Sequence, residues 1–290
     1  MRSRILLVAG VLPLQSVAQQ PVSSGVFDKI ARYTAFAAAS YSDDCPQPPN
    51  GTTIVKTFND AATDTQATLF RDTSANEVVI AFRGTSSPQD LDSDLTYQLV
   101  PLAVAGASCS SCKVHQGFQT SYNAIAGQVL SAVKSELSSG APRLIVTGHS
   151  LGAGIAAIAA TSFVGQGVRV AETYTFGEPR NGDPQWAGYV SQQLPDANYF
   201  RITHYNDGVP QIPPPLLGYA HHGAEYWQRE SKVNTAQSTV KCPVESTVAT
   251  QTCNAGQDFG SNPINGAHLT YSNTLIGSSL FVPACGAVFP

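Results

Sequence analysis

The chain has 290 residues, of which 42% are hydrophobic, and this length and content suit one large folded domain rather than a string of small modules. Its formal net charge is −4 and only 12% of its residues are charged, which argues against nucleic acid or an anionic membrane surface as a partner. No linker or internal repeat divides the sequence, so we expect a single domain, which we place at residues 19–290.

The first 18 residues have the pattern of a secretory signal peptide. Two arginines precede an apolar run over residues 5–12, and Ser16 and Ala18 supply the small side chains that signal peptidase accepts. The run is far shorter than the roughly 20 residues that cross a bilayer, so it predicts cleavage after Ala18 rather than an integral membrane segment. We therefore expect a secreted, extracellular protein.

Export determines how the six cysteines are interpreted. In an oxidising compartment they predict three disulfides, although the sequence alone does not decide among the possible pairings. Cys109 and Cys112 enclose two residues and are the pair that we favour first, because as a redox or zinc motif they lack partners. The other four are Cys45, Cys242, Cys253 and Cys285. Pairing the middle two would leave the outer two to close a loop over most of the chain.

One sequon for N-glycosylation begins at Asn50 and continues through Gly51 and Thr52. It lies beside Pro48 and Pro49, which indicates an exposed loop. In an exported protein such a loop fits the attachment of a glycan.

Helical and strand patterns alternate along the chain. In order, they predict a helix at residues 27–39, a strand at 77–83, a helix at 116–137, a strand at 143–147, a helix at 153–164, and strands at 171–176, 199–204 and 224–228. The run at residues 77–83 is apolar without interruption, which is typical of a strand buried on both faces of a parallel sheet. The alternation predicts an α/β fold with a mostly parallel central sheet and helices on both faces.

Residues 148–152, with the sequence GHSLG, lie between a predicted buried strand and an Ala-rich helix. A sharp turn there would strain the backbone of Ser150 and bring strand and helix so close that side chains at Gly148 and Gly152 would collide. The turn exposes the hydroxyl near a helix N-terminus, where negative charge is favoured. The pattern predicts that Ser150 is a catalytic nucleophile; the alternative is an ordinary glycine-rich turn.

A serine nucleophile needs a histidine base that is oriented by an acid, and after such a turn they follow in the order Ser, acid, His. We choose His268 because it lies downstream of every candidate acid, in a loop that contains glycine. We choose Asp207 because it follows the predicted strand at 199–204 on a loop. The histidines set aside are His149, His204, His221 and His222. The rival acids are Asp183 and Asp196, which fit helix caps or turns better.

The negative charge of a tetrahedral intermediate requires hydrogen-bond donors. The first is expected to be the backbone N–H of Leu151, the residue after the nucleophile. The second is expected at Thr85, where a turn at Gly84 follows the first buried strand, while Arg83 fits a structural ion pair better. This chemistry requires neither a metal nor an organic cofactor.

These motifs together resemble the class 3 lipases of filamentous fungi and the related type A feruloyl esterase. The similar segments are residues 82–85, 146–152, 174–180, 204–210 and 267–268, with further likeness to the esterase at 218–221 and 225–227. The resemblance implies an α/β-hydrolase fold, a triad of Ser150, Asp207 and His268, and an oxyanion hole at Thr85 and Leu151. It implies the disulfides Cys45–Cys285, Cys109–Cys112 and Cys242–Cys253. The chain lacks the terminal Trp of the esterase, which argues against specificity for phenolic esters.

The lid of the family falls on the segment after Thr85. Residues 87–90, with the sequence SPQD, predict the start of a helix through a capping box and a proline in the first turn. Leucines recur every fourth residue after it and would form an apolar stripe over the active site. The expected lid and substrate-binding residues are Leu91, Leu95, Tyr97 and Leu99. The alternative is a short surface helix.

The sequence thus predicts a secreted, monomeric serine hydrolase of carboxylic esters. We favour a lipase that hydrolyses triacylglycerols and short-chain esters through an acyl-enzyme on Ser150, with a lipid–water interface as a further partner. One alternative is a feruloyl esterase that acts on the phenolic esters of plant cell walls. Another is a secreted binding glycoprotein without catalytic activity, but the complete set of Ser150, Asp207, His268 and Thr85 argues against it.

Overall fold

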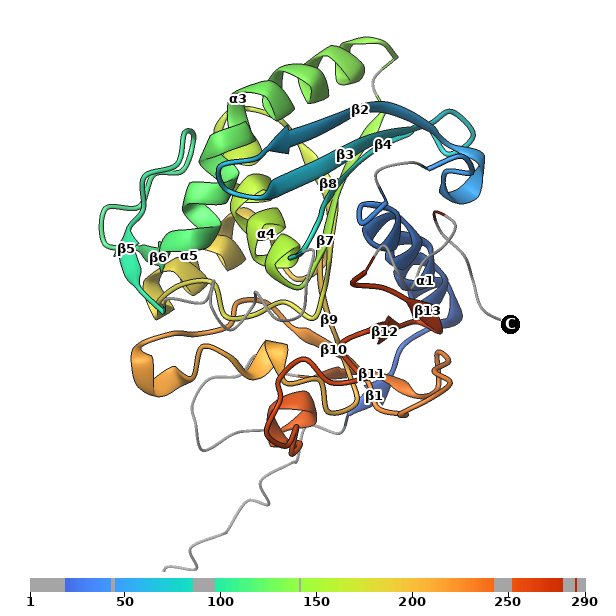
Figure 1. Cartoon of the computed structure of the whole chain (residues 1–290), viewed down its shortest axis with the longest axis vertical. Helices are drawn as coiled ribbons and strands as arrows, with labels where there is room; N and C mark the ends of the chain where they lie inside the picture. The colour runs from blue at the N-terminus through green and yellow to red at the C-terminus, as the bar shows by residue number, and fades with distance from the viewer. Residues whose placement is uncertain are drawn as a thin grey trace, which may run out of the picture.

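The computed structural model describes residues 19–42, 45–85, 97–140, 142–242, 252–278 and 285. Within these residues, nine strands form one sheet in the order β1-β11-β10-β9-β8-β7-β4-β3-β2. Helices cover both of its faces, so the predicted α/β fold is confirmed (Figure 1). The predicted signal peptide and most of the predicted lid lie outside the described residues.

The elements follow the predicted order. The strands of the sheet are β1 (Gln20–Pro21), β2 (Thr53–Asp60), β3 (Thr65–Asp72), β4 (Glu77–Phe82), β7 (Arg143–His149), β8 (Val170–Phe176), β9 (Tyr199–His204), β10 (Glu225–Gln228) and β11 (Thr239–Cys242). Two small pairs lie apart from it: β5 (Leu99–Pro101) with β6 (Lys113–His115), and β12 (Thr270–Tyr271) with β13 (Thr274–Leu275). The helices are α1 (Ser24–Ala39), α3 (Gln116–Ser138), α4 (Leu151–Gly165) and α5 (Pro184–Gln193), with single turns η1 (Pro49–Gly51), η2 (Val209–Gln211), η3 (Pro215–Leu217) and η5 (Cys253–Gly256).

The sheet is mixed rather than mostly parallel. Its centre, β4 with β7, β8, β9 and β10, is parallel as predicted. At one edge β2 and β3 pair antiparallel with each other and with β4, and at the other β11 pairs antiparallel with β10 and β1. These edge strands escaped prediction because they carry polar side chains among the apolar ones and lack the continuous apolar runs of the central strands.

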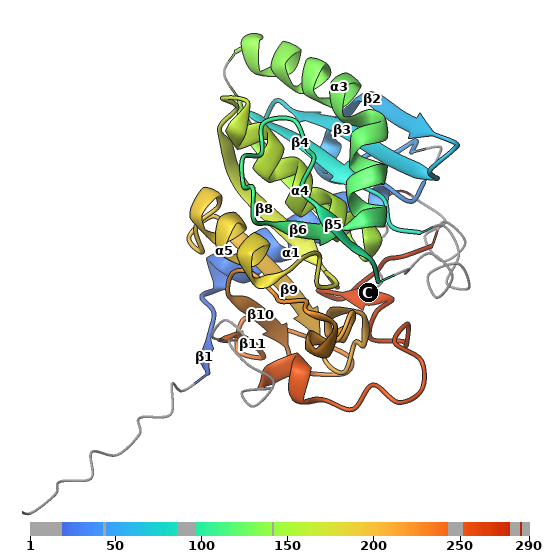
Figure 2. The ribbon, with the colours of Figure 1, turned by 90° about the vertical axis from the view of Figure 1, so that its left-hand side faces the viewer.

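Strand β4 shows how the two faces of the sheet are filled. Successive side chains of a strand point to opposite faces. Val78, Ile80 and Phe82 belong to the apolar core that contains α3, α4 and α5, whereas Val79 and Ala81 belong to the core that contains α1. Figure 2 shows α3, α4 and α5 in front of the sheet with α1 behind it. An apolar run in β4 is therefore required by burial on both sides.

Helix α4 is the innermost helix. Its residues from Gly152 to Phe163 are all buried, and it contacts β4, β7, β8, α3 and α5. A helix that is surrounded by protein needs small apolar side chains on every face, which explains its Ala-rich sequence. Because α4 follows β7 directly, its N-terminus is fixed at the end of that strand where β4 and β8 also end.

All three predicted disulfides are present. Cys45 is joined to Cys285, Cys109 to Cys112, and Cys242 to Cys253. The first closes a loop of 240 residues and ties the segment after α1 to the far end of the chain. The chain-entropy model gives such a long loop a stabilisation of roughly 5 kcal/mol.

Two surface expectations concern the membrane and the glycan. Among the described residues, no helix has the length and apolar character needed to span a bilayer. Asn50 is exposed at the turn η1, where the Thr52 hydroxyl donates a hydrogen bond to the carbonyl of Pro49. The sequon is therefore accessible on the surface.

Candidate active site

Ser150 occupies a sharp bend between β7 and α4. Its φ of 58° and ψ of −131° are unusual for a residue with a side chain, and its N–H donates to the carbonyl of Phe176 on β8 (2.9 Å). A Cβ atom at Gly148 would lie 2.3 Å from the carbonyl oxygen of Gly152, and one at Gly152 would lie 2.2 Å from that of Phe82. The bend therefore requires both glycines, as predicted, and it holds the Ser150 hydroxyl at the N-terminus of α4.

Asp207 and His268 come to Ser150 from two loops. Asp207 follows β9, and the N–H of Val209 donates to its Oδ1 (2.9 Å). His268 lies in a loop held by Asn265, whose Oδ1 accepts from the N–H groups of Ala267 (3.0 Å) and His268 (3.3 Å). The Asp207 loop begins where β9 ends, and the loop before β12 lies against the same end of β9 through the contact of Ala267 with His204, so residues far apart in the sequence meet there.

The three side chains form a continuous hydrogen-bonded series. Nε2 of His268 lies 2.9 Å from Ser150 Oγ, and Nδ1 lies 2.9 Å and 3.1 Å from the two carboxylate oxygens of Asp207. A neutral imidazole carries one proton, and the carboxylate accepts it from Nδ1, so Nε2 is left to accept the proton of the serine hydroxyl. Asp207 is fully buried and His268 is 2% exposed, so water competes little for these bonds.

Tyr271 is a further partner that the sequence did not reveal. Its hydroxyl donates to Oδ2 of Asp207, and it lies on β12, three residues after His268. Burial and the neighbouring carboxylate raise the pKa of Tyr271 well above its ordinary value, so the phenol remains a donor. The carboxylate of Asp207 thus accepts from a backbone N–H, an imidazole and a phenol. No motif marks this tyrosine.

The end of β4 brings Thr85 to the same place. A Cβ at Gly84 would lie 3.1 Å from Cβ of Ser150, so the turn passes directly against Ser150. The hydroxyl oxygen of Thr85 is buried and has no hydrogen-bond partner among the described residues. Leu151 opens α4, where backbone N–H groups have no partner within the helix. Buried donors without partners beside a serine hydroxyl suit a substrate oxygen that becomes negatively charged.

The residues that the sequence set aside are structural. Arg83 forms an ion pair with Asp64 (2.7 Å) and also donates to Gln66. Asp183 caps α5 by accepting from the N–H of Trp186 (2.8 Å), and Asp196 accepts from Ala224 (3.2 Å).

The other histidines also have structural partners. His221 donates to the carbonyl of Pro210 (2.7 Å), and His222 contacts the carboxylate of Glu178 (2.8 Å). His204 contacts the carbonyls of Ala267 and Glu230. All three side chains are buried, so these histidines pack inside the protein.

The predicted lid is described only at its end. Leu91 and Leu95 lie outside the described residues, and Tyr97 is 40% exposed. Leu99 does not continue a helical stripe: it begins β5 and pairs with His115 on β6. The helical expectation was wrong at this residue because Pro101 cannot be accommodated in a helix interior, whereas an edge strand accepts it.

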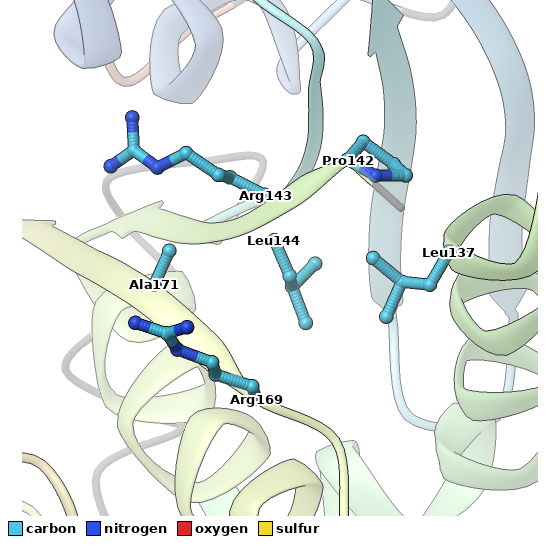
Figure 3. Close-up of a pocket in the computed structure, with 6 residues that line it drawn as sticks. All are labelled: Leu137, Pro142, Arg143, Leu144, Arg169 and Ala171. Carbon is cyan, nitrogen blue, oxygen red and sulfur yellow. The ribbon is translucent and has the colours of Figure 1, made fainter. Parts of the chain in front are cut away.

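Two cavities lie at opposite ends of the central strands. One of about 400 Å³ is lined by Leu151, by residues 61–64 and by the first turns of α3, and so lies beside the residue that follows Ser150. The other, of about 420 Å³, lies at the opposite ends of the central strands, where β7 and β8 begin (Figure 3). It is lined by Leu137, Pro142, Arg143, Leu144, Arg169 and Ala171.

One group of residues has the side-chain types of a metal site. Glu225 lies close to the sulfurs of Cys242 and Cys253. The two sulfurs are bonded to each other, so they are not thiolate ligands, and the Glu225 carboxylate accepts from Thr203 and from the N–H of Asn254. This donor set does not fit a metal ion.

Comparison with known proteins places this geometry in a family. The model of the family described as lipase (class 3) matches residues 79–217. A secreted mono- and diacylglycerol lipase A from Penicillium cyclopium is 32% identical over 225 residues, which cover 71% of this chain and 72% of the relative. The structure of Rhizomucor miehei triacylglyceride lipase matches with a TM-score of 0.77 and 29% identity, covering 90% of this chain and 99% of the other. A triacylglycerol lipase described as having a serine protease triad matches with a TM-score of 0.75 and 28% identity, covering 90% and 99%.

Proposed function

The chain belongs to the class 3 lipase family and is a carboxylic-ester hydrolase of the α/β-hydrolase fold; we propose that it is a secreted lipase that hydrolyses acylglycerols through an acyl-enzyme on Ser150. The observation that carries the proposal is the hydrogen-bonded series from Ser150 Oγ through His268 to Asp207. The alternative of a non-catalytic binding protein gives no physical reason for this series to be complete.

The reaction has two steps. In the first, Ser150 Oγ attacks the ester carbonyl while Nε2 of His268 takes its proton, and Asp207 stabilises the resulting imidazolium. The N–H of Leu151 and the N–H and hydroxyl of Thr85 bind the oxyanion. The tetrahedral intermediate then collapses, and His268 gives its proton to the departing alcohol. In the second step, His268 activates water in the same way, and the carboxylic acid leaves as Ser150 regains its proton.

Replacement of the nucleophile tests this assignment. We expect Ser150→Ala to lower hydrolysis of a nitrophenyl ester by at least about 10³-fold without unfolding the protein. Ser138→Ala, which removes an exposed hydroxyl at the end of α3, is the matched control and should keep full activity. An alkyl phosphonate should label Ser150. Full activity of Ser150→Ala, or labelling of another residue, would overturn the proposal.

The named relatives favour acylglycerols over phenolic esters as substrates. The relative from Penicillium cyclopium is named a mono- and diacylglycerol lipase, and the structural neighbour from Rhizomucor miehei is named a triacylglyceride lipase. Rates on tributyrin and on methyl ferulate, measured side by side, distinguish the two substrate classes. We expect the tributyrin rate to dominate, and the reverse result would establish the feruloyl esterase alternative.

A lipid–water interface is the proposed partner. Leu216 is 89% exposed and Leu217 is 49% exposed on η3, and a Cβ at Gly218 would lie 3.7 Å from Leu99. Neither residues 97–112 nor residues 208–220 contain a charged side chain. Two adjoining uncharged segments with exposed leucines suit docking by burial of apolar area on neutral lipid rather than attraction to an anionic surface.

Variants of the exposed leucines test this surface. Leu216→Ser with Leu217→Ser should weaken adsorption to a triolein emulsion several-fold while hydrolysis of soluble nitrophenyl acetate is unchanged. Val233→Ser, which alters a residue that is 67% exposed elsewhere, is the control and should adsorb like the wild type. Equal adsorption of all three proteins would contradict the proposed surface.

We also propose that residues 1–18 are removed on export and that residues 19–290 act as one monomeric domain. The support is the signal pattern of the sequence and the name of the relative from Penicillium cyclopium, which is a secreted lipase. N-terminal sequencing of the exported protein tests the cleavage, and light scattering tests the monomeric state. We further propose that Asn50 carries a glycan, which treatment with an endoglycosidase tests.

A further inference from the structure

Two buried side chains that the proposed reaction does not use connect the base to the turn before Thr85. His149 precedes the nucleophile in the chain and is 1% exposed, and Tyr41, which follows α1, is 4% exposed. The Tyr41 hydroxyl lies 2.8 Å from Nδ1 of His149, and Nε2 of His149 lies 2.9 Å from the backbone carbonyl oxygen of His268. The imidazole of His149 therefore bridges a tyrosine and the backbone of the base.

The direction of each hydrogen bond follows from the chemistry of the partners. A carbonyl oxygen can only accept, so Nε2 of His149 carries the proton, and in a neutral ring Nδ1 must then accept from the Tyr41 hydroxyl. Burial, with a further contribution from His268, lowers the pKa of His149 well below its ordinary value and keeps the ring neutral. Burial raises the pKa of Tyr41, which keeps the phenol protonated.

Tyr41 in turn is joined to the turn at Gly84. The Tyr41 oxygen packs directly against the backbone of Gly84, where an added Cβ would lie 2.1 Å from that oxygen. The hydrogen-bonded series runs from the Tyr41 hydroxyl, which contacts the Gly84 turn, to the imidazole of His149 and to the carbonyl of His268. Every donor points the same way, so the bonds polarise one another and strengthen together.

Packing fixes the middle of this series. The ring of His149 lies 4.5 Å from the ring of His268 at an angle of 30°, and edge-on to Tyr41 at 5.7 Å and to Tyr271 at 5.8 Å. A Cβ at Gly277 would lie 3.2 Å from Cε1 of His149. The imidazole has little room to rotate, so displacement of one end of the series is transmitted to the other.

We propose that His149 and Tyr41 are positioning residues that hold the backbone of His268 and the Gly84–Thr85 turn in a fixed relation to Ser150 Oγ. The inference rests on the proposed function, because it assigns the base to His268 and an oxyanion donor to Thr85. A neutral imidazole suits this place: when His268 takes the serine proton, a second positive ring 4.5 Å away would oppose that step, and His149 places none there.

The role predicts a specific kinetic signature. His268 and Thr85 act on the transition state more than on bound substrate, so loss of the series should lower kcat and leave KM nearly unchanged. We expect Tyr41→Phe, which removes one oxygen atom and keeps the ring, to lower kcat at least tenfold. Inactivation by an alkyl phosphonate, which mimics the tetrahedral intermediate at Ser150, should slow by a similar factor.

Tyr33→Phe is the matched control. Tyr33 comes from the same part of the chain, is 2% exposed and donates to Glu77 at the opposite edge of the sheet (3.0 Å). Both variants remove one buried phenol oxygen and should lower the free energy of unfolding, but only Tyr41→Phe should lower kcat. Similar kcat values for both variants and the wild type would overturn the proposal.

Variants at His149 distinguish loss of the hydrogen-bonded series from a general folding defect. His149→Gln keeps one donor and one acceptor on a side chain of similar reach, whereas His149→Leu keeps neither. We expect the Gln variant to retain more kcat than the Leu variant, and the double variant of Tyr41→Phe with His149→Leu to lose little beyond His149→Leu alone, because the residues act as a unit. Additive losses would contradict the series. Activity in Ser150→Ala would instead refute the proposed function, so the two failures are distinguishable.

Discussion

The parallel strands of the central sheet begin along one side of the sheet and end along the other. These two sides, which we call the first and the second edge, both bury polar side chains but use them differently. Where β4, β7 and β8 begin, Glu77 accepts from Tyr33 (3.0 Å) and pairs with Arg143 (3.0 Å) and Arg32 (3.4 Å). Where the same strands end, Ser150, His268 and Asp207 form their series, and the Thr85 hydroxyl has no partner among the described residues. The first edge pairs its charges within the protein, while the second keeps a buried hydroxyl that is without a partner among the described residues.

The two edges differ in whether their polar groups are paired with other groups of the protein. Charged groups that pair with one another, as in the contact of Lys29 with Glu172 (2.6 Å), hold α1 against the sheet. A group held by such partners is not available to a ligand. At the other edge the donors are neutral, which suits the proposed stabilisation of developing charge without reorganisation. Changes at the first edge should therefore alter stability, and changes at the second should alter activity.

The largest expected effect is that of Asp207→Asn. The carboxylate offers two acceptor oxygens to Nδ1, whereas the amide replaces one of them with an NH2 donor. An NH2 donor facing Nδ1 favours the imidazole tautomer with its proton on Nε2, so Nε2 can no longer accept the serine proton. We expect kcat to fall by roughly 10⁴-fold, measured with a nitrophenyl ester. Asp183→Asn is the control, because asparagine caps a helix as well as aspartate does and α5 should be unaffected. Equal activities of the two variants would remove Asp207 from the active site.

The next effect is at the opposite edge. Glu77→Ala leaves the Tyr33 hydroxyl without its acceptor, but Arg143 and Arg32 are 49% and 25% exposed and can reach water. The loss is therefore that of hydrogen bonds rather than of a stranded buried charge, and we expect the free energy of unfolding to fall by about 2 kcal/mol. Urea denaturation measures it. Activity per folded molecule should not change; a tenfold drop in kcat would show that the two edges are coupled.

The sequence predicted most of the active-site edge because its signals are local. The apolar run of β4 and the GHSLG bend with its Ala-rich helix are each encoded by neighbouring residues, and the order Ser, Asp, His restricted the partners. The structure brings together Ser150, Asp207 and His268, with Thr85 beside them. Ser150, Thr85 and Asp207 meet because the parallel strands β7, β4 and β9 end on the same side of the sheet, whereas His268 is brought there by the loop before β12.

What the sequence did not reveal depends on contacts between distant residues. Tyr41 and His149 are 108 positions apart, and no pattern in either segment relates them. Tyr271 is close to His268 in the chain, but only the folded loop turns its hydroxyl to Asp207. The edge strands β2 and β11 alternate weakly, and the stripe of leucines gave a helical period at Leu99 where pairing with β6 decides the structure. In each case tertiary contacts override the local signal.

The smallest expected effect is on the pH dependence of the free energy of unfolding, which should differ between groups at the two edges. Burial lowers the pKa of His115, which precedes α3 next to the cavity lined by Gln116 and Leu151, from 6.5 to about 4. Between these values the unfolded chain binds a proton that the folded chain does not, so stability falls as pH falls from 6.5 to 4. His115→Asn, which keeps a cap for α3, should reduce that fall by about 1 kcal/mol at pH 5.5, measured by urea denaturation.

Asp72, which pairs with Arg32 at the opposite edge, supplies the contrasting pH range. Hydrogen bonds from Ser74 and Ala75 and the pairing with Arg32 outweigh the opposing effect of burial and lower the pKa of this carboxyl from 3.8. Its contribution to stability is therefore complete above pH 3.8 and is lost only as pH falls through the lower folded value. Asp72→Asn should leave the slope between pH 4 and 6.5 unchanged and flatten it below pH 4. A neutral buried imidazole should change the slope of stability against pH above pH 4, and a paired carboxylate should change it below pH 4. If His115→Asn and Asp72→Asn flattened this slope over the same pH range, the proposed difference between the two edges would be wrong.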